Sequence, residues 1–227
     1  MSLQLYFAPG ACSFVPHVML EACGAAFEPK IVKLHKGEQY GADYQAINPR
    51  GQVPVLVVNT DAGGQPITQI IAITTFIADS FPSANFMPQA PAAKAKYLET
   101  LSWLNNTVHP TFTHIFMSQK FSNDVAAQAS MKAFNIPLLA ARLAELDAMV
   151  SRAKDMGGQY IAAAYGHDHL TALDAYTLTV NRWGSIAGID PTQFKHSWAH
   201  IQMLAALPAV ARVIERERLQ LNMMASA

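Results

Sequence analysis

The sequence has little charge and no long apolar run. Charged residues make up 14% of the 227 residues, and 16 basic side chains balance 16 acidic ones. A chain without net charge offers no electrostatic attraction to nucleic acid or to an anionic membrane. No apolar stretch approaches the length of a membrane span, and the first residues lack the basic and apolar regions of a signal peptide.

Cysteine is also scarce, since only Cys12 and Cys23 are present. Both fall on one predicted helix, about three turns apart, which is too far for a disulfide between them. Reduced thiols are typical of a cytoplasmic protein. Apolar residues, in contrast, make up 51% of the chain, and the length suits one large domain or two small ones.

The first third of the chain alternates short apolar runs with helical periodicity. This pattern predicts a mixed sheet covered by helices, in the order βαβ-α-ββα. Proline within 27–32 indicates an edge strand, and Thr68 is a candidate cap for the predicted helix at 69–79. The expected strands are 3–6, 27–32, 53–58 and 66–67, and the expected helices are 14–23, a short one ending near 46, and 69–79.

A proline-rich break then separates two patterns. We expect a first domain at 1–82, a linker at 83–91 and an all-helical domain at 92–227. One helix is predicted at 92–107, continuing toward Lys120 with a kink at Pro110, and another at 124–149, bent or divided by Pro137. The remaining predicted helices are 175–186, 194–206 and 209–219.

Cys12 lies where the first strand passes to the first helix. Ser13 beside it is a good N-cap, and the free N–H groups of a helix start stabilise a thiolate, so the pKa of Cys12 should fall. The helix dipole contributes only about 0.3–1 kcal/mol, whereas one pKa unit requires about 1.4 kcal/mol. Direct hydrogen bonds would also be needed. The alternative is that Cys12 is a small buried residue at a tight packing point.

Several histidines and acids invite a functional interpretation that the sequence supports weakly. His196 and His200 have the spacing of a metal pair, but no third ligand accompanies them, so we expect no metal. Asp174, three residues after Thr171 and before an apolar run, fits a capping box better than a catalytic site. His109, on a mostly apolar helix, is by itself more typical of an interior histidine.

Several segments together resemble the bacterial glutathione transferases, most closely the beta class with its active-site cysteine. They are APGACS at 8–13 with Pro16 and His17, AINPRGQVPVL at 46–56, WLN at 103–105, Val108 with His109, and TALDAY at 171–176. The resemblance covers nearly the whole chain. It implies a thioredoxin-like N-terminal domain, an all-helical C-terminal domain and a homodimer.

The same resemblance implies roles for individual residues. Cys12 would lie beside the glutathione sulfur, with Ser13 as a secondary hydrogen-bond donor. Val53, before a cis-proline at Pro54, would offer its backbone to the cysteinyl part of glutathione. The residues implied for the rest of the site are Gln69 and Ile70 at the γ-glutamyl end, His109 facing the same cleft, and, as weaker candidates, Asn105 and Lys36, the latter for the glycyl carboxylate.

The function so implied is a cytoplasmic glutathione transferase that serves detoxification. It would conjugate glutathione, its cosubstrate, to electrophiles, with thiol–disulfide exchange or peroxide reduction through Cys12. The family usually has Ser, Asp or Gly where Ile70 stands, so a lost hydrogen bond could weaken glutathione binding. The alternative is therefore a non-catalytic binding protein of the same fold. A maleylacetoacetate isomerase is disfavoured because its serine-rich signature does not stand at 11–16. The sequence does not identify the second substrate.

Overall fold

The computed structural model describes residues 2–61 and 63–224, which form two compact units. The first unit contains residues up to 87 together with 205–219, and the second contains 88–204 with 220–224. A mixed α/β unit and a helical unit are therefore present, as predicted. The segment 205–219 groups with the first unit, whereas the sequence had placed it in an all-helical domain at 92–227.

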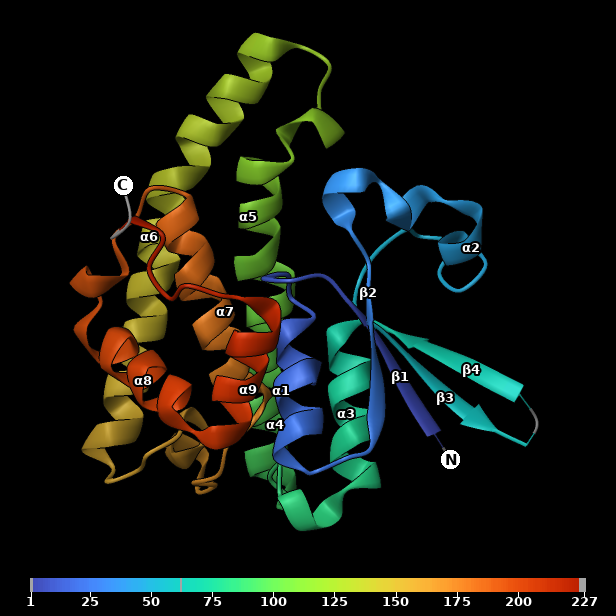
Figure 1. Ribbon diagram of the computed structural model, residues 1–227. Helices are drawn as coiled ribbons and strands as arrows, with labels where there is room; N and C mark the ends of the chain where they lie inside the picture. Colours follow the sequence, from blue (N-terminus) through green and yellow to red (C-terminus); the bar gives the residue numbers. More distant parts are fainter. Residues whose placement is uncertain (1, 62, 225–227) are drawn as a thin grey trace. The chain divides into compact units, whose positions relative to one another are not determined.

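The first unit is built on a four-stranded sheet in the order β2-β1-β3-β4 (Figure 1). Strand β1 (Ser2–Phe7) pairs parallel with β2 (Phe27–Ile31) and antiparallel with β3 (Val55–Thr60), which pairs antiparallel with β4 (Gly63–Thr68). The predicted edge position of the proline-containing strand is confirmed, because β2 is the first strand of the sheet.

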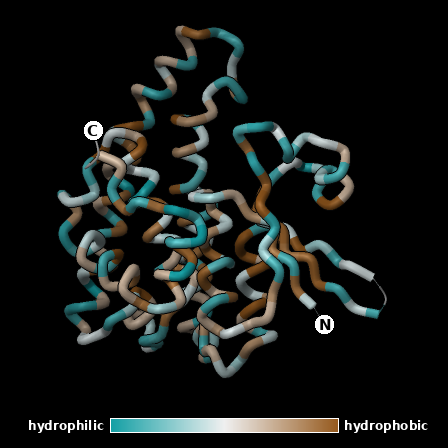
Figure 2. The backbone as a smooth tube through the Cα atoms, viewed as in Figure 1, coloured by the Kyte–Doolittle hydropathy of each residue, from teal (hydrophilic) through white to brown (hydrophobic). Residues whose placement is uncertain are grey.

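Both faces of this sheet are covered. Helices α1 (Phe14–Ala22) and α3 (Ile70–Ser80) pack against each other, and Figure 1 shows them on one face of the sheet. Val55 and Val57 of β3 pack against Tyr44 of α2 (Ala42–Gln45), and the alternate side chains of β3 are buried too. Hydrophobic colour accordingly follows β3, while β4 is more hydrophilic (Figure 2). The short turns of this unit are η1 (Leu34–Lys36), η2 (Glu38–Tyr40) and η3 (Pro82–Ala84).

Helix α9 (Pro208–Glu217) packs along α1 within the same unit (Figure 1). Its buried side chains are Val210, Val213 and Glu217. Their spacing of three to four residues gives α9 one buried stripe. The last helix of the chain is therefore part of the layer that covers the first helix.

The second unit is helical. Its long helices are α4 (Pro91–Trp103), α5 (His109–Phe116), α6 (Val125–Asp155), α7 (Ala172–Ile186) and α8 (Lys195–Ala206). Shorter turns η4 (Leu104–Val108), η5 (Ser118–Lys120), η6 (Ile161–Tyr165) and η7 (Pro191–Gln193) connect them. Among the described residues, no helix combines the length and apolarity that crossing a membrane requires.

Two prolines act differently from each other in these helices. Ahead of Pro110 the chain forms a π-helical turn, in which the N–H of His109 bonds to the carbonyl of Leu104. Proline removes one donor and crowds the preceding turn, so a widened turn lets the helix pass it without ending. Pro137 does not divide the second predicted helix, because α6 is a single helix that contains it.

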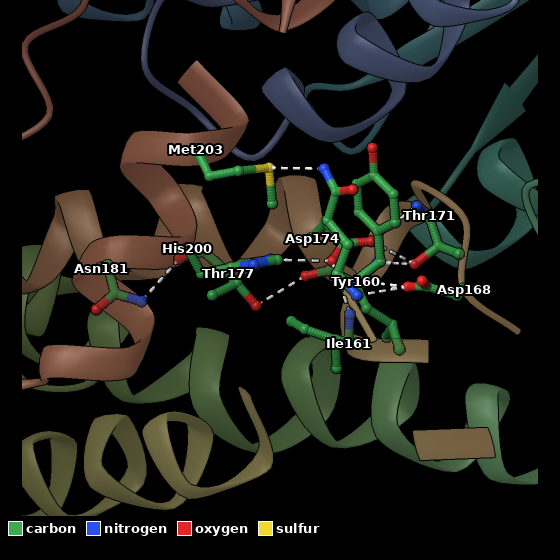
Figure 3. Close-up of polar contacts among 11 residues, drawn as sticks. Tyr160, Ile161, Asp168, Thr171, Asp174, Thr177, Asn181, His200 and Met203 are labelled. Carbon is green, nitrogen blue, oxygen red and sulfur yellow. Dashed lines mark hydrogen bonds and ion pairs between the residues drawn. The ribbon is translucent and has the colours of Figure 1, made fainter. Parts of the chain in front are cut away.

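Asp174 organises a buried polar network in the second unit (Figure 3). Its Oδ2 accepts the backbone N–H of Thr171 at 2.8 Å, completing a capping box at the start of α7. Its Oδ1 lies 3.0 Å from the N–H of Ile161 and 3.0 Å from Nε2 of His200. The interpretation of Asp174 as a capping residue is confirmed. His200 belongs to the same network.

Candidate functional site

The loop between β1 and α1 is closed by the hydroxyl of Ser13. This hydroxyl accepts the N–H of Ala8 at 3.1 Å and donates to the carbonyl of Ala8 at 3.2 Å. Ser13 stands at the N-cap position of α1, but its side chain makes no capping hydrogen bond. The expectation that Ser13 caps the helix is therefore wrong in its chemistry. Its hydroxyl instead fixes the loop that carries Cys12.

Cys12 lies against the chain that leads into β3. Its Sγ is 3.6 Å from the carbonyl oxygen of Val53, a sulfur–oxygen hydrogen bond in which the thiol donates. The Val53–Pro54 peptide bond is cis, the isomer that the resemblance implied. Two residues 41 positions apart in sequence, both assigned to glutathione binding by the resemblance, are thus in contact.

The expected lowering of the Cys12 pKa is wrong for this structure. The residue is 8% exposed, and burial raises the pKa of the thiol from 9.0 to about 12. The N–H groups of Cys12 and Ser13 lower the pKa, as expected of a helix start, but by less than burial raises it. Near neutral pH the sulfur is therefore a protonated thiol that donates to Val53.

Two side chains fix the turn that precedes Val53. The hydroxyl of Tyr44 and the amide Nδ2 of Asn48 each donate to the carbonyl of Gln52 at 2.7 Å. Gly51 in the same turn has a φ of 62°, and an added Cβ there would meet the carbonyl of Gln39 at 3.0 Å. A residue with a side chain would be strained at this point. The backbone that leads to Val53 is thus held by a phenol and an amide.

Gln69 and Ile70 lie at the start of α3. Gln69 is exposed and has a φ of 74°, a left-handed conformation unusual for a residue other than glycine. Ile70 is 3% exposed, so its side chain belongs to the core and only its backbone can serve a ligand. Free N–H groups at a helix start favour an anion such as a carboxylate. Lys36, the weaker candidate of this unit, is exposed on η1.

His109 and Asn105 meet at a third side chain in the second unit. The Tyr176 hydroxyl lies 2.7 Å from Nδ1 of His109 and donates to Oδ1 of Asn105 at 3.4 Å. The ring of Trp183 packs edge-on to His109, with centroids 4.9 Å apart. Burial lowers the pKa of His109 from 6.5 to about 4, so the imidazole is neutral near pH 7.

The sequence singled out neither Tyr176 nor Glu217 for these contacts. Tyr176 was visible only as part of a motif at the start of α7. Glu217 accepts a hydrogen bond from Gly10, which lies 207 positions earlier in the chain. No local sequence pattern predicts a contact between residues so far apart in the chain.

A family model and relatives that align along nearly the whole chain match this sequence. Residues 1–79 match the model of the glutathione S-transferase N-terminal domain. The chain is 30% identical to glutathione S-transferase GST-4.5 of Xanthomonas campestris pv. campestris and 29% identical to GstA of Escherichia coli O157:H7. Each alignment covers 96% of this chain and all of the relative.

Solved structures of the same kind superpose on nearly the whole chain. A beta-class glutathione S-transferase of Sphingomonas chungbukensis has a TM-score of 0.77 at 26% identity, covering 96% of this chain and 100% of its own. A glutathione transferase homologue from Sulfitobacter with bound glutathione has a TM-score of 0.84 at 24% identity, with 96% and 99% covered. The second similarity is evidence for the fold alone.

Proposed function

The chain belongs to the glutathione S-transferase family, and we propose that it is an enzyme that joins glutathione to small electrophiles. The observation that carries this proposal is similarity to glutathione S-transferases over 96% of the chain. The contact between Cys12 and Val53 adds to it, because the resemblance assigned Cys12 to the glutathione sulfur and the backbone of Val53 to the cysteinyl part of glutathione.

Glutathione binding is proposed to occur along the first unit. The backbone of Val53, ahead of Pro54, would pair with the cysteinyl part of the tripeptide. Gln69 and the N–H of Ile70 would receive the γ-glutamyl carboxylate, which the start of α3 favours electrostatically. Lys36 would approach the glycyl carboxylate. Because position 70 would contribute its backbone N–H, the missing hydroxyl at Ile70 does not remove the site.

The nucleophile is proposed to be the glutathione thiolate. The N–H groups of Cys12 and Ser13, which already lower the pKa of the Cys12 thiol, would stabilise the second sulfur in the same way. That thiolate attacks the electrophilic carbon, a C–S bond forms, and the leaving group departs with its electron pair. Cys12 remains a thiol that donates a hydrogen bond. His109 and Asn105 are proposed to face the second substrate.

Disulfide exchange or peroxide reduction through Cys12 is proposed as a minor activity. Both reactions need a thiolate at Cys12, and burial works against that form. Conjugation needs no charge on Cys12. We therefore expect conjugation to exceed exchange.

Calorimetric titration with glutathione tests the proposal together with a conjugation assay on a chloronitroaromatic substrate. Micromolar binding and turnover above the uncatalysed rate would support it. Absence of binding at millimolar glutathione would restore the alternative of a non-catalytic protein, which nothing in the comparisons favours.

Two further properties belong to the proposal. A homodimer is supported by large apolar side chains left exposed around the start of α6, Phe121 at 51%, Val125 at 78% and Phe134 at 72%. Light scattering after size exclusion would give the mass of the particle. A cytoplasmic location and a role in detoxification are supported by the two free cysteines and by the chemistry of conjugation.

A further inference from the structure

The carboxylate of Glu217, at the end of α9, is enclosed by the first unit. Its side chain is 0% exposed. One oxygen, Oε2, accepts the N–H of Gly10 at 2.8 Å, and the other, Oε1, lies 2.7 Å from Nδ1 of His17 on α1. Gly10, with a φ of 71°, belongs to the loop that carries Cys12 two residues later. Helix α9 thus holds the loop that precedes helix α1.

The hydrogen bonds around His17 identify which group carries the negative charge. Nη1 of Arg216 lies 2.9 Å from Nε2 of His17. A guanidinium can only donate, so Nε2 must accept, and the imidazole proton lies on Nδ1 and is donated to Glu217. His17 is therefore neutral, and Glu217 is the anion beneath the loop. The cluster contains two more charged groups, Glu21 and Arg212. The carboxylate of Glu21 pairs with Arg216 at 2.6 Å and with Arg212 at 3.0 Å.

We propose that Glu217 is a positioning residue that fixes the Gly10–Ser13 loop from the C-terminal helix and disfavours negative charge on Cys12. The tether follows from the bond to Gly10, and the electrostatic effect follows from a buried carboxylate beside the same loop. Burial is the main cause of the raised pKa of the Cys12 thiol, and the charge of Glu217 acts in the same direction as the smallest of the contributions. A second effect acts in the same direction, because the thiol has a hydrogen-bond acceptor in Val53 only while it keeps its proton.

The consequence for catalysis depends on the proposed function. If glutathione binds beside Cys12, Glu217 keeps the protein sulfur from competing as the nucleophile. Glutathione then supplies the thiolate, and Cys12 supplies a donor. The inference about Cys12 itself can be tested without glutathione, so it stands or falls separately from the proposed activity.

The test is the pH dependence of Cys12 alkylation by iodoacetamide, followed by intact mass. Cys23→Ser serves as the parent, because the chain has no other cysteine besides these two. In Glu217→Gln the alkylation rate at pH 8 should rise about threefold or more, the effect of half a pKa unit on the thiolate fraction, and the rate profile should move to lower pH. Glu215→Gln removes an exposed charge from the same helix and should leave the profile unchanged.

An unchanged profile in folded Glu217→Gln would overturn the proposal, and so would an equal shift in Glu215→Gln. If Glu217→Gln fails to fold, the parent itself decides through amide hydrogen exchange at Gly10. Protection of this amide like that of core amides supports the tether. Exchange as fast as that of exposed loop amides refutes it. A conjugation assay on the same samples reports separately on the proposed function.

Discussion

The Tyr176 hydroxyl lies 2.7 Å from Nδ1 of His109 and 3.4 Å from Oδ1 of Asn105, so one phenol joins both candidate residues of the helical unit. Tyr176 is fully buried on α7. If its proton goes to Asn105, its oxygen accepts from His109 Nδ1–H, which leaves Nε2 as the hydrogen-bond acceptor of the ring. Tyr176 therefore positions the histidine that is proposed to face the second substrate.

Removing that hydroxyl should separate positioning from folding. In Tyr176→Phe we expect the free energy of unfolding to fall by about 0.5–1.5 kcal/mol for each hydrogen bond lost. The conjugation rate should fall because the KM of the electrophile rises, and this fall should be larger than the loss of folded protein explains. Glutathione affinity should be unchanged. Urea denaturation and steady-state kinetics with both substrates measure these effects. Equal losses for the two substrates would argue against a role of His109 at the second one.

Burial of His109 should make stability depend on pH. The unfolded chain binds a proton at this residue near pH 6.5 and the folded chain only near pH 4, so between these values the unfolded state holds more protons. Stability then falls as the pH drops below 6.5, by about 1.4 kcal/mol for each unit until pH 4 is approached. Urea denaturation at pH 7 and pH 5 should show this loss, and His109→Gln should reduce it. An exposed histidine on η1 provides the control His35→Asn. The same pH dependence in all three proteins would contradict the prediction.

The Asp174 network should be a major determinant of stability. Asp174→Ala leaves the N–H groups of Ile161 and Thr171 and the Nε2 of His200 without their acceptor in a buried site. Each buried donor left without its acceptor costs about 1–3 kcal/mol, so the total loss should exceed that of a single hydrogen bond. Chemical denaturation measures the effect. Thr171→Ser keeps a hydroxyl at the cap and should cost far less. A loss below 1 kcal/mol in Asp174→Ala would show that the network contributes little.

The sequence predicted what depends on local pattern. The presence of strand β3, the edge position of β2 and the capping box at Asp174 follow from residue type and spacing, and the structure confirms them. The burial of Cys12 does not follow, because desolvation is set by distant segments such as the chain at Val53. Glu217 could not be predicted at all, since its partners lie about 200 positions earlier.

The left-handed backbone conformation of Gln69 should lower the stability of the protein, while its side chain contributes to glutathione binding. Gln69→Gly removes the steric penalty of a φ of 74°, so the free energy of unfolding should rise by about 0.5–1 kcal/mol. Glutathione affinity should fall about threefold to tenfold, the effect of a lost side-chain contact. Arg218, which is exposed and has a φ of 54°, supplies the control Arg218→Gly. It should gain stability and bind glutathione normally. Unchanged affinity in Gln69→Gly would exclude a role for this side chain.

The position of Ile70 reverses the effect first expected of a serine there. From the sequence alone, Ile70→Ser should restore a hydroxyl for the γ-glutamyl carboxylate. In the structure Ile70 is 3% exposed and belongs to the core, so the serine would leave a cavity and a buried hydroxyl instead. We expect a loss of about 3 kcal/mol or more of unfolding free energy with no gain in glutathione affinity. Ile71→Ser, at the half-buried neighbouring position, should cost less. Denaturation and calorimetry on both variants decide the matter, because tighter glutathione binding by a stable Ile70→Ser protein would mean that position 70 faces the ligand after all.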